Sequence, residues 1–147
     1  MKGWDTFAAI TGGGAAALIG FLFVSVSINI DVFAGVPDLR NRATQVLIQF
    51  ATVLFISIFI ALPGQAYWML GTEVVVLAIA NLYGEMALPS SPPNPAFTLI
   101  VLFLAAAGIV LIFGLPAGLY VLVIPVLAAF FFGGYLAWMY LLAFKSE

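Results

Sequence analysis

Long runs of apolar residues fill most of this chain, and short polar breaks separate them. The runs are continuously apolar, whereas membrane strands alternate polar and apolar positions over about ten residues. A helix needs about 20 apolar residues to cross a bilayer core about 30 Å thick. Five runs meet that length. The pattern therefore predicts an all-α membrane protein with a bundle of five transmembrane helices, at about residues 7–29, 43–62, 66–86, 96–113 and 118–144.

The breaks between the runs contain residues that end helices. Pro63-Gly64 and the segment 114–118 leave room only for tight turns, so each is expected to join an antiparallel pair of helices. The proline-rich segment 89–95 predicts a stiff, extended connection, because proline fixes φ and lacks a backbone donor. In the first break, we expect Asp38 or Asn41 to cap the second helix.

Composition supports the membrane assignment and excludes several functions. Apolar residues make up 65% of the 147 positions and charged residues only 7%, against about 25% charged residues in soluble domains. The chain has no cysteine, no histidine and a net charge of −2, which argues against disulfides, the common zinc sites and nucleic-acid binding. We therefore expect a single transmembrane domain over residues 1–147, with no metal and no cofactor.

Five spans place the two termini on opposite sides of the membrane. Three of the four basic residues fall on the side of the C-terminus: Arg40, Arg42 and Lys145. The positive-inside rule then favours an N-terminus outside and a C-terminus in the cytoplasm. The first run faintly resembles a signal peptide, but its length and Asp5 at its start favour a retained helix.

Polar residues inside the spans are the best functional signal, because they are costly in hydrocarbon. We expect the first three helices to surround a polar interior and the last two to face lipid. The candidate polar path comprises Ser25, Asn29, Gln45, Gln49, Thr52 and Asn81. Two interpretations remain open. These residues either form hydrogen bonds between helices, worth about 0.6 kcal/mol each, or line a hydrated permeation path.

Glu73 is the sharpest single candidate. It lies inside the third predicted helix, roughly 7 Å below the interface at a rise of 1.5 Å per residue. Thr72, Gln65 and Thr11 are its expected neighbours. Glu73 is either a cation or proton site, with Thr72 and Gln65 beside it, or a neutral carboxylic acid that hydrogen-bonds across helices or reaches the interface.

Small residues give a separate signal on two helices. Gly13, Ala17 and Gly20 recur on the first predicted helix, and Gly133 lies on the last. Such faces let helix backbones approach closely. They pack helices either within one subunit or between subunits.

Two motifs in the first half of the chain carry a family resemblance. Gly20–Asn29 reads GFLFVSVSIN, and an apolar helix ending in Pro63-Gly64-Gln65 is followed by Leu70-Gly71-Thr72-Glu73. This half resembles a group of small, uncharacterised multi-spanning bacterial membrane proteins, some of which are labelled as modulators of a membrane protease. The resemblance implies a bacterial inner membrane and a shared role for the regions 25–29 and 65–73. It implies no activity.

The expected function is that of a homo-oligomeric channel or transport module for ions or small solutes, with the lipid bilayer as its surroundings. The alternative is a non-enzymatic accessory or regulatory subunit of a larger membrane complex. An enzyme is not expected, because no pair of residues supplies a base and a nucleophile. Ser25 and Glu73, the nearest approach to such a pair, are predicted in opposite halves of the bilayer.

Overall fold

The computed structural model describes residues 3–87 and 95–143. Within these residues the chain forms six helices and no strand. They are α1 (Asp5–Ile28), α2 (Ile30–Gly35), α3 (Pro37–Ala61), α4 (Tyr67–Met86), α5 (Pro95–Ile112) and α6 (Ala117–Ala143). In the described part of the chain, five of them, all except α2, are long and apolar enough to cross a membrane. The predicted fold class is confirmed.

The break between the first two spans differs from the prediction. It was expected to be a loop up to residue 42, but it contains the short α2, and α3 begins at Pro37. Proline fits the first turn of a helix because that turn leaves its N–H groups unpaired in any case. The predicted cap by Asp38 or Asn41 is wrong. Val36 precedes α3 in an extended conformation, without a side-chain cap.

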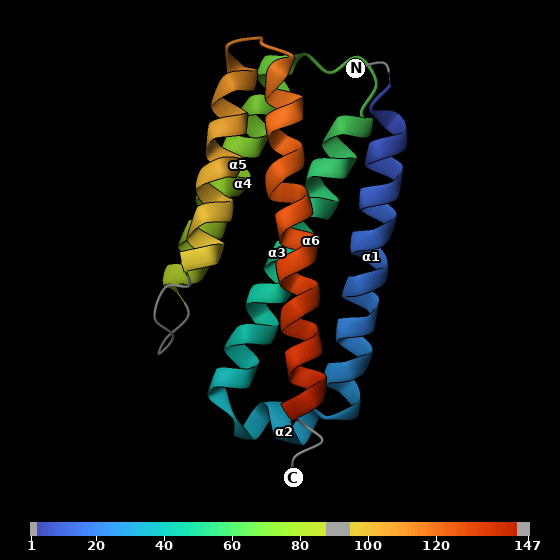
Figure 1. Ribbon diagram of the computed structural model, residues 1–147, viewed down its shortest axis with the longest axis vertical. Helices are drawn as coiled ribbons and strands as arrows, with labels where there is room; N and C mark the ends of the chain where they lie inside the picture. The colour runs from blue at the N-terminus through green and yellow to red at the C-terminus, as the bar shows by residue number, and fades with distance from the viewer. Residues whose placement is uncertain (1–2, 88–94, 144–147) are drawn as a thin grey trace.

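The two predicted tight turns are confirmed. Gly64 lies between α3 and α4 with φ of 75°, and Gly114 lies between α5 and α6 with φ of 74°. Glycine is the residue that adopts positive φ without strain, so each turn needs it. The proline-rich segment 89–94, for which an extended connection was predicted, lies outside the described residues. Figure 1 shows that α1 begins and α6 ends at opposite ends of the bundle, as an odd number of spans requires.

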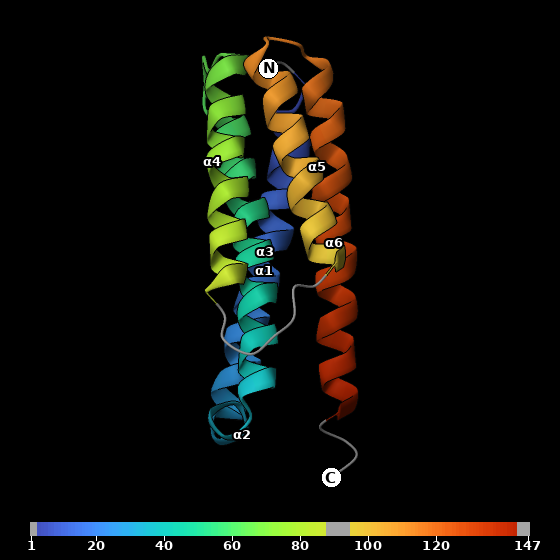
Figure 2. The same ribbon diagram turned by 90° about the vertical axis from the view of Figure 1, so that its left-hand side faces the viewer.

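The helix α3 lies at the centre of the bundle (Figures 1 and 2). It packs against α1, α4 and α6, while α5 packs against α4 and α6. Half of the apolar span of α3 is buried, whereas only 17% of the span of α1 is. The spans of α5 and α6 are each 33% buried, the same share as the span of α4. The contrast predicted between the first three spans and the last two is therefore not seen. The least apolar span, α4, and the most apolar span, α5, are buried to the same extent, so the apolar content of a span does not reveal which helices are covered.

Glycines allow close contacts between helices at two places in the bundle. Gly71 of α4 and Gly108 of α5 cross so closely that a Cβ on Gly71 would lie 2.6 Å from the Gly108 carbonyl oxygen. Gly133 of α6 lies against the ring of Phe50 in α3, which a Cβ would meet at 2.6 Å. By contrast, Gly13 and Gly20 have open space around them, and Ala17 is exposed. The structure thus places Gly133 in an internal contact and turns the other three candidates outward.

Candidate functional site

Thr52 of α3 and Asn81 of α4 form the central polar contact of the bundle. Asn81 Nδ2 donates to Thr52 Oγ1 at 2.8 Å and to the Leu77 carbonyl oxygen at 2.7 Å. The Thr52 hydroxyl lies 2.8 Å from the Ile48 carbonyl oxygen and 3.1 Å from Asn81 Oδ1, so its single proton has two acceptors. Both donors of the Asn81 amide are satisfied. At this pair the interpretation as hydrogen bonding between helices holds.

Gln49 lies one turn before Thr52 on the same face of α3, and its amide is unsatisfied. Its side chain is 3% exposed. Neither Nε2 nor Oε1 has a hydrogen-bond partner among the described residues. An unpaired polar group in a buried position costs about 1–3 kcal/mol. Gln49 stands twelve residues from each end of α3, or roughly 18 Å at the helical rise, so it lies at the middle of this helix.

A small cavity adjoins this amide. It has a volume of about 20 Å³ and is lined by Gln49, Thr52 and Asn81, with apolar side chains of α5 and α6 and with Pro125. A site needs about 10–15 Å³ and two to four polar partners to hold one water molecule. The cavity thus has room for one water molecule, but its accessible lining is almost entirely apolar.

Two further buried residues extend the polar cluster toward the α2 end of the bundle. Gln45 is 7% exposed and lies one turn from Gln49 on the same helix face. Glu85 is 9% exposed and follows Asn81 by one turn of α4. Because α3 and α4 are antiparallel, Glu85 lies level with the Gln45–Gln49 turn. We call Gln45, Gln49, Thr52, Asn81 and Glu85 the polar column.

The predicted site around Glu73 lies toward the opposite end of α4. Gln65 Nε2 donates to Glu73 Oε2, so these two candidates are in contact. Gln65 Oε1 is buried and has no partner among the described residues. Thr72 does not join them, because its side chain is exposed and its hydroxyl donates to the Trp68 carbonyl oxygen at 2.9 Å. Glu73 itself is half-buried.

The predicted path residues on α1 do not reach the polar column. Asn29 Nδ2 donates to the Ser25 carbonyl oxygen at 3.1 Å, a bond within one turn of the chain. Neither residue lines the cavity beside Gln49. Thr11, expected near Glu73, instead makes a 2.8 Å hydroxyl–hydroxyl hydrogen bond with Ser57 of α3. Of the six candidate path residues, the structure brings together Gln45, Gln49, Thr52 and Asn81.

Sequence reasoning missed Ser57 and Glu85. Ser57 lies beside Gly12, and a Cβ added to Gly12 would lie 3.0 Å from the Cβ of Ser57. A small residue next to Thr11 was therefore the available signal for a close α1–α3 contact. Glu85 lies four residues after Asn81, which places both on one face of α4. That spacing was the available signal for a second interior carboxyl group.

The Thr52–Asn81 bond should appear as a coupling energy in a double-mutant cycle. We expect Thr52→Val and Asn81→Leu to couple by about 1 kcal/mol, within the range measured for bonds between membrane helices. The measurement is the free energy of unfolding in mixed micelles at increasing denaturing detergent. Thr44→Val combined with Asn81→Leu is the control, because the Thr44 hydroxyl donates within α3 to the Arg40 carbonyl oxygen. Equal coupling in both cycles would contradict the contact.

In the part of the chain that the structure describes, no group of three or more His, Cys, Asp and Glu residues could hold a metal ion. The five apolar helices fit a multi-pass membrane protein. No family model matches this chain, and neither a curated protein nor a solved structure matches it. The resemblance in the first half of the chain therefore stays a prediction, and so does the orientation of the termini.

Proposed function

We propose that this protein is a membrane transport module that conducts protons through the interior of its own helix bundle, along α3 and α4. The observation that carries the proposal is the Gln49 amide, which is buried at the middle of α3 beside a small cavity with both polar atoms unpartnered. Polar groups in this position are expensive and mark solute pathways in membrane proteins. A hydrated relay would supply the partners that Gln49 lacks.

The location of the polar column supports a route inside one subunit. Gln45, Gln49, Thr52 and Asn81 are each at most 9% exposed within a single chain. A pore on an axis between identical subunits would have to be lined by exposed side chains. The expected homo-oligomer therefore does not need a central pore, because each subunit would carry its own pathway.

The proton is the cargo that best fits the groups along this route. The cavity has room for about one water molecule, and its polar groups are neutral amides and a hydroxyl. Glu73 and Glu85 lie on α4 on either side of this level, twelve residues apart, or roughly 18 Å along the helix. Carboxyl groups take up and release protons, and chains of them serve as relays in pumps and transporters.

An apolar layer separates the polar column from the Gln65–Glu73 pair. It includes Ile56, Ile60, Leu70 and Val74, each at most 2% exposed. Apolar constrictions close pores by excluding water. Conduction would therefore require water to enter this layer transiently, so the layer would act as the gate.

Proton flux into liposomes tests the proposal. Purified protein is reconstituted with an internal pH-sensitive dye, and a potassium gradient with valinomycin sets the driving potential. We expect wild-type protein to acidify the lumen faster than empty liposomes do. Gln49→Leu should slow that flux by about tenfold. Losing the hydrogen bonds of the amide would raise the activation free energy for proton transfer by roughly the value of one hydrogen bond.

Ser57→Ala provides the matched control, because Ser57 is also buried on α3 but bonds to Thr11 outside the column. It should leave the flux unchanged. A folded wild-type protein that conducts no faster than empty liposomes would refute proton conduction. Osmotic water flow that Gln49→Leu abolishes, without proton flux, would replace the proton by water as the cargo.

The accessory-subunit alternative has one observation in its favour. The outward face of α1 carries small, exposed residues: Ala9, Gly13, Ala16, Ala17 and Gly20. Small residues on an uncovered face permit close approach of another helix. The detergent-corrected mass of the purified protein separates the two cases. A defined oligomer would favour self-association on this face, and a monomer that copurifies with other chains would favour the accessory role.

A further inference from the structure

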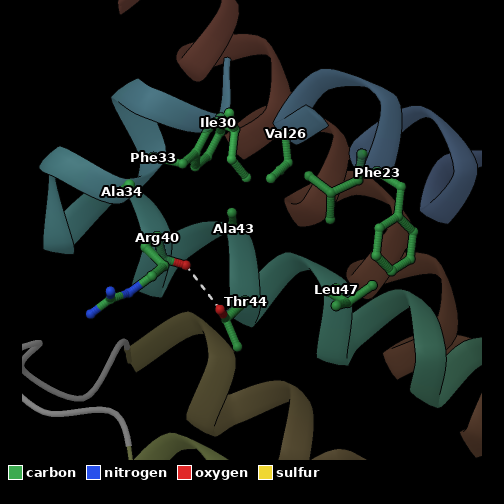
Figure 3. Close-up of a pocket in the computed structure, with 10 residues that line it drawn as sticks. Phe23, Val26, Ile30, Phe33, Ala34, Arg40, Ala43, Thr44 and Leu47 are labelled. Carbon is green, nitrogen blue, oxygen red and sulfur yellow. Dashed lines mark hydrogen bonds between the residues drawn. The ribbon is translucent and has the colours of Figure 1, made fainter. Parts of the chain in front are cut away.

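An apolar groove lies between α1, α2 and α3, at the end of the bundle away from the Gly64 and Gly114 turns (Figures 1 and 3). Its volume is about 340 Å³, at the lower end of the range for ligand sites. Eight of the ten lining residues are apolar: Leu22, Phe23, Val26, Ile30, Phe33, Ala34, Ala43 and Leu47. The other two are Arg40 and Thr44. The groove is separate from the polar column, since no column residue lines it.

The groove runs along the helices rather than across them. On α3 its lining extends from Arg40 to Leu47, and on the α1 side from Ile30 back to Leu22. These stretches correspond to about 10–12 Å at 1.5 Å per residue. The helices span the bilayer, so the groove lies parallel to the lipid chains around it. An acyl chain has this direction and this apolar character.

The polar residues of the groove are arranged at one edge. The Thr44 hydroxyl donates to the Arg40 carbonyl oxygen at 2.9 Å, so it needs no partner from an occupant. Figure 3 shows the apolar side chains gathered on one side of Arg40, while its guanidinium points away from them. Arg40 is exposed and stands in the first turn of α3. The groove thus pairs an apolar interior with a cation at the level of the membrane interface.

We propose that this groove binds an anionic phospholipid, with one acyl chain between α1 and α3 and the phosphate on Arg40. Arginine matches phosphate geometrically because its planar fork can donate two parallel hydrogen bonds. Arg42, Asp31 and Asp38 are exposed near the same end, but none of them lines the groove. Among the described residues that line the groove, Arg40 is therefore the only charged one.

The dimensions of the groove argue against a second protein helix as the occupant. A helix segment about 10 Å across and as long as the groove would occupy roughly 800 Å³, which is more than twice the groove volume of about 340 Å³. A single acyl chain is far narrower than a helix. Ala34 and Ala43, two small residues among the lining, leave the space that such a chain would fill.

Native mass spectrometry of the intact protein in detergent micelles tests this site. The probes are phosphatidylglycerol and phosphatidylcholine with identical acyl chains. We expect one phosphatidylglycerol per chain to bind about tenfold more tightly than phosphatidylcholine, a difference of about 1.4 kcal/mol. Both lipids carry the phosphate, but the choline cation of phosphatidylcholine cancels the net negative charge that attracts Arg40. Glycerol 3-phosphate, which has the phosphate but no acyl chain, should not displace it.

Three variants make the test specific, with folding checked by circular dichroism. Arg40→Gln should remove the preference for phosphatidylglycerol, while Arg42→Gln, the same charge change two residues away, should retain it. Ala34→Phe should weaken the binding of both lipids, because the larger side chain would extend from α2 and fill the groove. If Arg40→Gln and Arg42→Gln reduce the preference for phosphatidylglycerol equally, the proposal is overturned, and the preference reflects the overall positive charge of this surface. Dimers in place of lipid adducts would overturn it in favour of a second copy of the chain.

Discussion

Gly71→Ala is expected to lower the free energy of unfolding by about 3 kcal/mol, the upper part of the range for overpacked sites. A Cβ on Gly71 would lie 2.5 Å from the Ile112 backbone nitrogen and 2.6 Å from the Gly108 carbonyl oxygen. Both atoms belong to the backbone of α5, so no side-chain rotation relieves the clash. The helices α4 and α5 would have to separate along their shared interface. The gain in helix propensity, about 1 kcal/mol, does not offset this cost.

Detergent-induced unfolding, followed by tryptophan fluorescence, measures the effect. Gly20→Ala and Gly13→Ala are matched controls, because nothing lies within 4 Å of a Cβ at either position. These two variants should be neutral or slightly stabilising. A Gly71→Ala protein as stable as the Gly20→Ala protein would show that α4 and α5 do not cross at Gly71.

Span location was predictable because about 20 consecutive apolar residues have one main use in a helical protein, which is to cross a bilayer. The first break was not predictable in the same way. Asp31, Asp38 and Arg40 indicate a loop by polarity, yet α2 and the first turn of α3 occupy this region. Helix ends at the membrane interface are exposed to water and headgroups, so polarity does not distinguish them from loops.

The sequence pattern also did not predict which helices pack against one another. Gly13 and Ala17 have the spacing of a packing motif but lie on the exposed face of α1. Gly71 and Gly108, which form the close crossing, are isolated glycines on different helices. Spacing shows that two small residues share a face. It does not show that another helix covers that face.

The candidate site was predicted where polar residues recur at three- and four-residue spacing on a helix that proved central. Gln45, Gln49 and Thr52 share one face of α3, and each is buried. The same spacing failed for Ser25 and Asn29, because α1 is the most exposed span and their bond stays within the helix end. Whether a polar face turns inward depends on tertiary packing, which helical periodicity alone does not contain.

Gln49→Leu is expected to keep or raise the free energy of unfolding, by up to about 2 kcal/mol, although it removes a polar residue at the centre of the column. The wild-type amide has no partner among the described residues, so the substitution breaks no bond with them. It also removes the cost of burying an unpaired polar group. A water molecule in the adjoining cavity would lower this gain toward zero, since the bonds between water and amide would be lost as well.

Asn81→Leu is the contrasting variant, because Asn81 bonds to Thr52 across the α3–α4 interface. We expect it to lower the free energy of unfolding by about 1 kcal/mol, so the two leucine variants should shift stability in opposite directions. The same detergent titration measures both. If Gln49→Leu slows proton flux while stability is kept, the amide acts in conduction rather than in holding the bundle together. A loss of stability in Gln49→Leu as large as that in Asn81→Leu would instead show that Gln49 has a structural partner, and the argument for a hydrated relay would fail with it.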